Sequence, residues 1–82
     1  MATRVTRSVY SPAYARLREG LIVARQERGL TQAQLAAALS RPQSFVSKYE
    51  TGERRLDFVE VIEIAEILAL DIGMLVRRVR ED

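Results

Sequence analysis

Residues 31–52 read TQAQLAAALSRPQSFVSKYETG, and they predict two short helices joined by a tight turn. Thr31 is a good N-cap for a helix over residues 32–39, because its side-chain oxygen can accept a bond from a free backbone N–H. Pro42 ends that helix, since proline disfavours a helical residue before it. A second helix is expected over 43–50. The residues expected to face inward are Leu35, Ala36, Leu39, Val46 and Tyr49.

The connection between these two helices is only about three residues long, so the helices must cross steeply. Such a crossing needs a small residue where the helices touch. Ala36 is expected to be that residue, because a bulky side chain there would push the second helix away.

Three further helical patterns flank this pair. One begins at Ser11-Pro12, with serine as N-cap and proline in the first turn, and ends at Gly29. Another begins at Asp57 with Glu60 three residues later, an aspartate form of the capping box. The last begins near Asp71. The predicted inward stripes are Tyr14, Leu17, Leu21 and Ala24, then Phe58, Val61, Ile62, Ala65 and Leu68, then Ile72, Leu75, Val76 and Val79.

The organisation is therefore an all-α, compact five-helix domain over residues 12–80, with a helix-turn-helix at about 32–51. Residues 1–11 form an N-terminal arm whose role stays open. Its Arg4, Arg7 and Tyr10 are compatible with an arm on DNA, with pairing to a partner chain, or with a flexible end.

Composition excludes several classes of protein. The 82 residues include no cysteine and no histidine, which removes disulfides, the usual zinc sites and the commonest general base. No catalytic constellation stands out, so we expect no enzyme, no metal and no cofactor. No apolar run approaches the ~20 residues of a membrane span, and no signal peptide is present, which predicts a soluble cytoplasmic protein.

Charge is distributed unevenly along the chain. Ten basic and four acidic residues precede position 57, whereas three basic and seven acidic residues follow from Asp57 onward. A basic half joined to an acidic half suits a protein that meets a polyanion on one side.

The helix over 43–50 carries the residues suited to reading DNA. Glutamine can bond bidentately to adenine, serine can bond either partner of a base pair, and lysine reaches guanine or a phosphate. The predicted base-contacting residues are Gln43, Ser44, Ser47 and Lys48. Arg41, Thr51, Arg54 and Arg55 flank this helix and are predicted to contact phosphates.

The pattern TQ-x-x-LA followed by Q-S-x-V-S-x-x-E-x-G resembles the Cro/C1-type (XRE) helix-turn-helix family. The similarity spans roughly Tyr14 to Val79. It implies a lambda-repressor-like fold, binding to double-stranded DNA, and control of transcription, with the helix around 43–50 in the major groove. It also implies that Gln32, at a helix N-terminus, contacts phosphate. We expect a repressor.

Two positions depart from the family pattern, and a third residue is ambiguous. Ser40 stands where glycine is usual, which costs free energy if the backbone there has positive φ. Pro42 stands where a capping serine or threonine is common. Phe45 lies among the predicted readers, and it can pack within the protein, the favoured alternative, or over a thymine methyl.

The second half of the chain offers more apolar surface than one thin helical layer needs. The residues counted as surplus are Ile62, Ile64, Ile67, Ile72, Leu75 and Val76. Together with the family's habit of dimerising through its last helix, they predict a homodimer with recognition helices about 34 Å apart. The alternative to a dimer is that these residues all lie in the core of the single chain. The alternative to a transcriptional regulator is an antitoxin-like interaction module that also binds DNA and a protein partner of unknown identity. An end at Asp82 leaves little room for a segment that would wrap such a partner.

Overall fold

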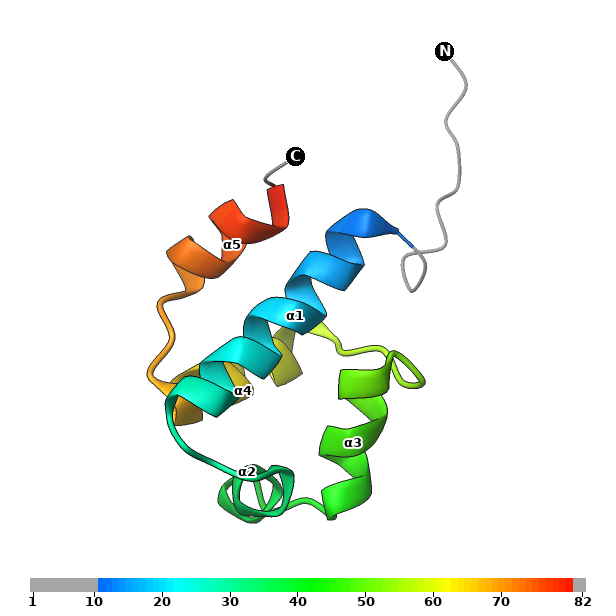
Figure 1. Ribbon diagram of the computed structural model, residues 1–82, viewed down its shortest axis with the longest axis vertical. Coiled ribbons are helices and arrows are strands. Elements are labelled where there is room, and N and C mark those ends of the chain that lie inside the picture. The colour runs from blue at the N-terminus through cyan, green and yellow to red at the C-terminus, as the bar shows by residue number, and fades with distance from the viewer. Residues whose placement is uncertain (1–10, 81–82) are drawn as a thin grey trace.

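Five α-helices account for the regular structure of residues 11–80, which are the residues that the computed structural model describes. In chain order they are α1 (Pro12–Glu27), α2 (Gln32–Ala38), α3 (Gln43–Thr51), α4 (Phe58–Leu68) and α5 (Ile72–Arg80) (Figure 1). Residues 11–80 contain no strand, so the all-helical prediction is confirmed. The arm residues Arg4, Arg7 and Tyr10 lie outside the described range.

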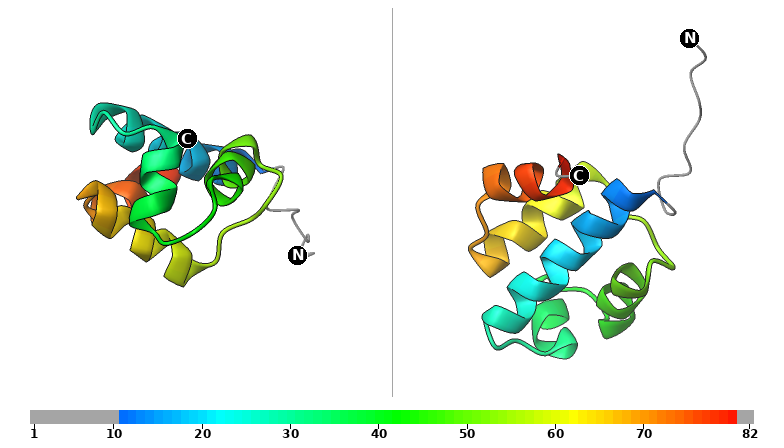
Figure 2. Two further views of the ribbon diagram at one scale, coloured as in Figure 1. Left: turned by 90° about the horizontal axis from the view of Figure 1, so that it is seen from below. Right: turned by 45° about the horizontal axis from the view of Figure 1, so that its top comes forward.

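The longest helix, α1, organises the others. It packs against α3, α4 and α5, while α2 packs mainly against α3. In Figures 1 and 2, α5 lies beside one part of α1, and the α2–α3 pair lies at the opposite end of the molecule. The helix-turn-helix is thus presented at one end of the domain, away from α5.

Side-chain caps begin α1, α2 and α4. The backbone N–H of Tyr14 donates to Ser11 Oγ at 3.0 Å. The capping box predicted between Asp57 and Glu60 is present. Thr31 also forms a complete capping box with Gln34, of which the sequence analysis identified only the threonine. These caps satisfy N–H groups that have no partner inside their helices.

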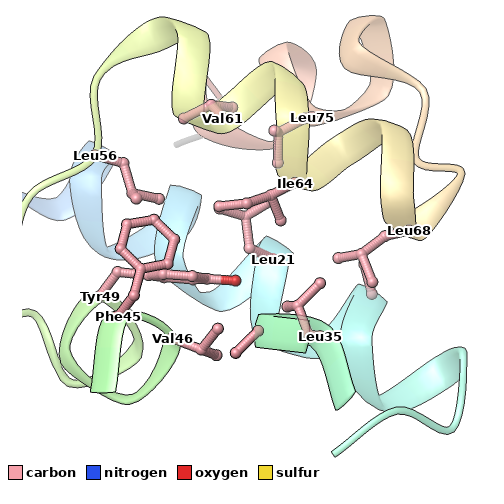
Figure 3. Packing of buried hydrophobic residues seen from close by; sticks show 12 residues of the cluster. Leu21, Leu35, Phe45, Val46, Tyr49, Leu56, Val61, Ile64, Leu68 and Leu75 are labelled. Carbon is pink, nitrogen blue, oxygen red and sulfur yellow. The ribbon is translucent and has the colours of Figure 1, made fainter. Parts of the chain in front are cut away.

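The core is one cluster to which every helix contributes (Figure 3). Leu21 of α1, Leu35 of α2, Val46 and Tyr49 of α3 and Ile64 of α4 are almost completely buried. The hydroxyl of Tyr14 accepts a hydrogen bond from the backbone N–H of Leu56 at 3.0 Å, which ties the loop before α4 to α1. Burial of these apolar side chains is the main favourable term in folding such a small domain.

Several predicted inward positions are wrong. Phe58 is 69% exposed and Val76 is 45% exposed. Both line the rim of an apolar groove between α1, α4 and α5, whose inner positions are taken by Val61 and Leu75. Phe58 is the first residue of α4, so its side chain projects at the end of the helix, where no neighbouring helix covers it. Ile62 is only half-buried, because α4 turns Ile64 to the core instead.

Fewer apolar side chains of the second half of the chain are left outside the core than the sequence indicates. Ile64 and Leu75 are 0% and 4% exposed, so both belong to the core of the single chain. Ile67 and Ile72 are half-buried against that core. The large hydrophobic side chains that do remain exposed are Phe58, Val59, Met74 and Val76.

A glycine allows α5 to approach α1 closely. A Cβ atom at Gly20 would lie 2.9 Å from Arg78 Cδ and 3.0 Å from Leu75 Cδ1. These distances are shorter than ordinary van der Waals contact, so a side chain at this position would require Leu75 and Arg78 of α5 to shift. The sequence pattern gives no sign of this role, because Gly20 lies in the middle of a helix.

The turn between α4 and α5 contains a residue in the left-handed region. Ala69 has φ of +53°. Its N–H donates to Glu66 O at 3.2 Å and the N–H of Leu70 donates to Ala65 O at 2.8 Å. This pair of bonds is a Schellman motif, which usually carries glycine at that position.

Candidate nucleic-acid interface

The turn between α2 and α3 sets the angle of the predicted recognition helix. The N–H of Arg41 donates to Ala36 O at 2.9 Å and the N–H of Ser40 donates to Ala37 O at 3.0 Å, a second Schellman motif. Ser40 has φ of +59°, so the positive φ considered from the sequence is present and serine occupies a glycine-favouring conformation. Ala36 is buried within the core cluster, and α2 packs against α3.

The first turn of α3 has no side-chain cap. Pro42 is its N-cap residue and makes no side-chain hydrogen bond, which confirms the expectation from the sequence. Proline has φ of −65° here, which suits an extended residue entering a helix. The unpaired N–H groups of such a helix start, together with the helix dipole, favour an anion.

Helix α3 separates a buried face from a polar face. Phe45, Val46 and Tyr49 are buried, and burial raises the pKa of the Tyr49 hydroxyl well above its usual value. Gln43, Ser44 and Lys48 are exposed and Ser47 is half-exposed, with its hydroxyl 3.5 Å from the Ser44 carbonyl. The structure therefore brings all four predicted base-contacting residues together on the outer face of one helix.

Glu50 anchors α3 to the rest of the domain. Its carboxylate accepts from Arg25 Nε at 2.7 Å and Nη2 at 3.0 Å, a bidentate pair with side chains 12% and 6% exposed. The hydrogen bond to Glu50 is the largest influence that raises the pKa of Arg25 above its usual value. Arg18 Nη1 donates to the backbone carbonyl of Glu50 at 2.8 Å. Two arginines of α1 thus hold the C-terminal end of α3.

Gln32 belongs to the same anchor. Its Nε2 donates to Glu50 Oε1 at 2.9 Å. Gln32 was predicted to contact phosphate, and its side chain is already oriented by Glu50. One N–H of the amide is used in that bond, and the second is available to another acceptor.

A second charged cluster covers the other side of α3. The guanidinium carbons of Arg41 and Arg54 lie 4.3 Å and 4.8 Å from the centre of the Phe45 ring. Arg54 donates to both oxygens of Glu60 at 3.0 Å, and Arg41 lies 3.5 Å from Glu60. We name these four residues the arginine cluster.

The arginine cluster settles the position of Phe45. Its side chain is 7% exposed, and it packs edge-on against Tyr49 with ring centres 5.5 Å apart. The favoured alternative, packing within the protein, is therefore confirmed. The position of Arg41 and Arg54 over its ring also gives each guanidinium a cation–π contact.

Two predicted phosphate-contacting residues lie beyond the C-terminal end of the polar face of α3. Thr51 is exposed and its hydroxyl donates to Lys48 O at 3.1 Å. Arg55 is exposed, with its guanidinium carbon 5.9 Å from the centre of the Tyr14 ring. Basic side chains thus stand beside both ends of α3, with Arg41 before it and Arg54 and Arg55 after it.

Sequence reasoning missed the partners that orient these side chains. Arg25 and Arg18 were not singled out, and Glu60 was identified only as a capping residue. No local pattern indicates the bond between Arg25 and Glu50, since these residues are far apart along the chain. Glu50 itself offers the one usable signal, because it lies next to the inward-facing Tyr49 in the sequence and a buried carboxylate needs a charged or hydrogen-bonding partner.

Metal-ligand groups and membrane-spanning helices are both absent from residues 11–80. That range contains no group of three or more acidic, cysteine or histidine side chains arranged to hold a metal ion. Its helices are too short or too polar to cross a membrane.

Comparison with known proteins identifies a helix-turn-helix family. A family model described as helix-turn-helix matches residues 21–75, about two thirds of the chain. No curated protein matches the chain. The matched range contains α2, α3, α4, Glu50 with its partners Arg25 and Gln32, and the arginine cluster.

Proposed function

Because the chain belongs to the Cro/C1-type helix-turn-helix family of DNA-binding transcription regulators, we propose that it is a sequence-specific repressor. Residues 12–80 act as one DNA-binding domain with its helix-turn-helix at about 32–51. Helix α3 enters the major groove of double-stranded DNA. The family is one of regulators and not of enzymes, so the proposal concerns binding and not catalysis.

The observation that carries the proposal is the rigid presentation of a polar helix face. Gln43, Ser44 and Lys48 are exposed on α3, while Glu50 at its other end is held by Arg25 and Arg18. A reader must keep its side chains in register with base edges, which requires a helix that does not rotate on its domain. The anchor at Glu50 supports that requirement.

Each polar residue of this face has a role in the proposal. Gln43 reads adenine through its amide, and Lys48 reads guanine or reaches a phosphate. Ser44 and Ser47 bond to neighbouring base edges or phosphates. The backbone contacts that fix the register come from Gln32, Arg41, Thr51, Arg54 and Arg55.

The test is binding to a DNA site selected from random sequences and to random DNA, measured by fluorescence anisotropy across salt concentrations. Wild type should prefer the selected site by ~1,000-fold or more. Gln43→Ala should lose about 1–3 kcal/mol of that preference. Gln26→Ala is the matched control, since Gln26 is an exposed glutamine on α1 outside the proposed interface, and it should retain the preference. Equal binding of all DNA by wild type would overturn the proposal.

Repression follows from occupancy. A domain bound across a promoter blocks other proteins that need the same DNA, and no further contact is required. In transcription with purified components, the protein should lower transcript yield from a template whose selected site overlaps the promoter. A template with the site far upstream should be unaffected. A rise in yield from either template would contradict the repressor assignment.

We also propose that the protein binds DNA as a homodimer through the apolar groove between α1, α4 and α5. Phe58 and Val76 stand exposed on its rim, and Met74 and Val59 are exposed nearby in the chain. A two-fold dimer would place two copies of α3 about one turn of DNA apart. Sedimentation should give a dimer for wild type and a monomer for Val76→Glu. A wild-type monomer would favour the alternative, an antitoxin-like module whose groove takes another protein.

A further inference from the structure

The arginine cluster places a carboxylate inside the surface that is proposed to meet phosphate. Glu60 accepts from Arg54 at both of its oxygens, at 3.0 Å each, and lies 3.5 Å from Arg41. Two cations share one anion, so the cluster carries one positive charge where its arginines alone would carry two. The hydrogen bond from Arg54 is the largest influence that lowers the pKa of Glu60, so the carboxylate is ionised at neutral pH.

Glu60 cannot swing away when a phosphate approaches. Its side chain is 10% exposed and it belongs to the capping box at the start of α4. Its Oε1 accepts from the backbone N–H of Asp57 at 2.9 Å, and its own N–H donates to Asp57 Oδ1 at 2.8 Å. Any rearrangement that freed the arginines from Glu60 by moving the carboxylate would also break one of the two hydrogen bonds of the capping box, the one from the backbone N–H of Asp57.

The two arginines are restricted on more than one side. Each guanidinium stacks against Phe45, which is itself buried. Two hydrogen bonds to Glu60 fix the direction of the Arg54 guanidinium, and Arg41 lies at ion-pair distance from the same carboxylate. The side chains of Arg41 and Arg54 nevertheless remain 35% and 41% exposed. They can therefore meet a phosphate without leaving their positions.

We propose that Glu60 is a specificity-determining residue of this DNA-binding surface. It removes one unit of charge that would attract any DNA equally, and it holds Arg41 and Arg54 in the one geometry that matches the phosphates of the preferred site. The inference rests on the proposed function, because it concerns how selectively the protein binds DNA.

Selectivity is the ratio of the affinity for the preferred site to the affinity for random DNA. Positive charge that is not held in a fixed orientation raises both affinities, because it attracts phosphates without reading sequence. An acid beside the phosphate-contacting arginines lowers the affinity for random DNA, where phosphates are not placed to match the fixed guanidinium groups. Weakening the wrong complex is an established route to specificity.

Glu60→Gln tests the inference directly. Glutamine has nearly the same shape and also serves in a capping box, so the variant removes charge while retaining the cap. Its affinity for random DNA should rise, with a salt dependence steeper by about 0.9 in log–log slope, which is roughly a three- to four-fold larger change between 50 and 200 mM salt. The affinity for the preferred site should rise less, so the selectivity ratio should fall several-fold.

Glu19→Gln is the matched control. It makes the same change in net charge on α1, where Glu19 is exposed and lies 3.8 Å from Arg78 of α5. General electrostatics would raise the affinity of this variant for both kinds of DNA by the same small factor, and its selectivity ratio should equal that of wild type. Circular dichroism and thermal unfolding would establish that both variants are folded.

A double variant separates charge from positioning, and it provides a second test if Glu60→Gln folds poorly. Glu60→Gln with Arg54→Gln restores the net charge and leaves no unpaired arginine at position 54. Its affinity for random DNA and its salt dependence should return to wild-type values, while its selectivity ratio stays low because the positioned guanidinium is lost.

Two results would overturn the inference. One is a selectivity ratio for Glu60→Gln equal to that of Glu19→Gln. The other is a double variant that regains wild-type selectivity. Both require a selective wild-type protein, so they differ from failure of the proposed function, in which wild type itself binds all DNA alike.

Discussion

Arg25 of α1 and Glu50 of α3 form a bidentate ion pair, with Nε 2.7 Å and Nη2 3.0 Å from the two carboxylate oxygens. Arg25 also donates from Nη1 to the carbonyl of Leu30, at 2.8 Å, just before α2. One guanidinium therefore links α1, the loop before α2 and the end of α3. This one side chain therefore helps to fix how α3 is oriented on the domain.

Removal of the Glu50 carboxylate should show how much the ion pair between Arg25 and Glu50 stabilises the domain. Glu50→Leu leaves Arg25 and Gln32 without their acceptor in a buried setting, and we expect a loss of about 3 kcal/mol in the free energy of unfolding. Urea denaturation measures it. Glu53→Leu, an exposed position nearby, should change stability by less than about 0.5 kcal/mol. Adding Arg25→Met to Glu50→Leu should recover part of the loss, and strict additivity of the two changes would contradict the account.

Two turns hold non-glycine residues at positive φ, and glycine should stabilise both. Ser40 and Ala69 have φ of +59° and +53°. Glycine removes the energetic cost of positive φ, although it also has more conformational entropy to lose on folding. We therefore expect Ser40→Gly and Ala69→Gly each to raise the free energy of unfolding by about 0.5–1 kcal/mol. Ala37→Gly, at an exposed position inside α2, should instead lose about 1 kcal/mol. Thermal unfolding of the three variants decides, and a loss at all three positions would rule out the explanation.

Acid should weaken the domain through Glu60. The hydrogen bond from Arg54 lowers the pKa of Glu60 in the folded state below the usual value of 4.5. The ionised Glu60 therefore contributes its full stabilisation above pH 4.5, and this contribution is lost as the pH falls through the lowered pKa. Glu60→Gln should be less stable than wild type near pH 7, and the difference should shrink at lower pH. Urea denaturation between about pH 7 and pH 2.5 measures both curves. A difference that stays constant over that range would show that the pair does not contribute through ionisation.

A large residue at Gly20 should separate α5 from α1. Gly20→Leu would drive a side chain into Leu75 and Arg78, which approach within 3.0 Å of the Cβ position. We expect a loss of about 1–3 kcal/mol and faster hydrogen exchange in α5 than in α3. Ala15→Leu, on an exposed part of the same helix, is the control and should leave α5 protected. Unchanged exchange in α5 for Gly20→Leu would mean that the helix can shift without penalty.

The sequence alone determined the features that depend on residues a few positions apart. The caps at Ser11, Thr31 and Asp57 and the small residue Ala36 are where the sequence places them. The polar face of α3 with Gln43 could also be predicted. Capping and helical periodicity are local, because an N-cap acts within its own first turn and residues three or four apart share one face.

Tertiary structure decided which faces are covered and which charges meet. Periodicity groups Phe58 with Val61 but cannot say that α1 and α5 bury only one of them. The bonds of Glu50 to Arg25 and of Glu60 to Arg54, and the approach of α5 to Gly20, depend on how the helices cross. Such crossings follow from packing among all five helices, and no single stretch of sequence contains that information.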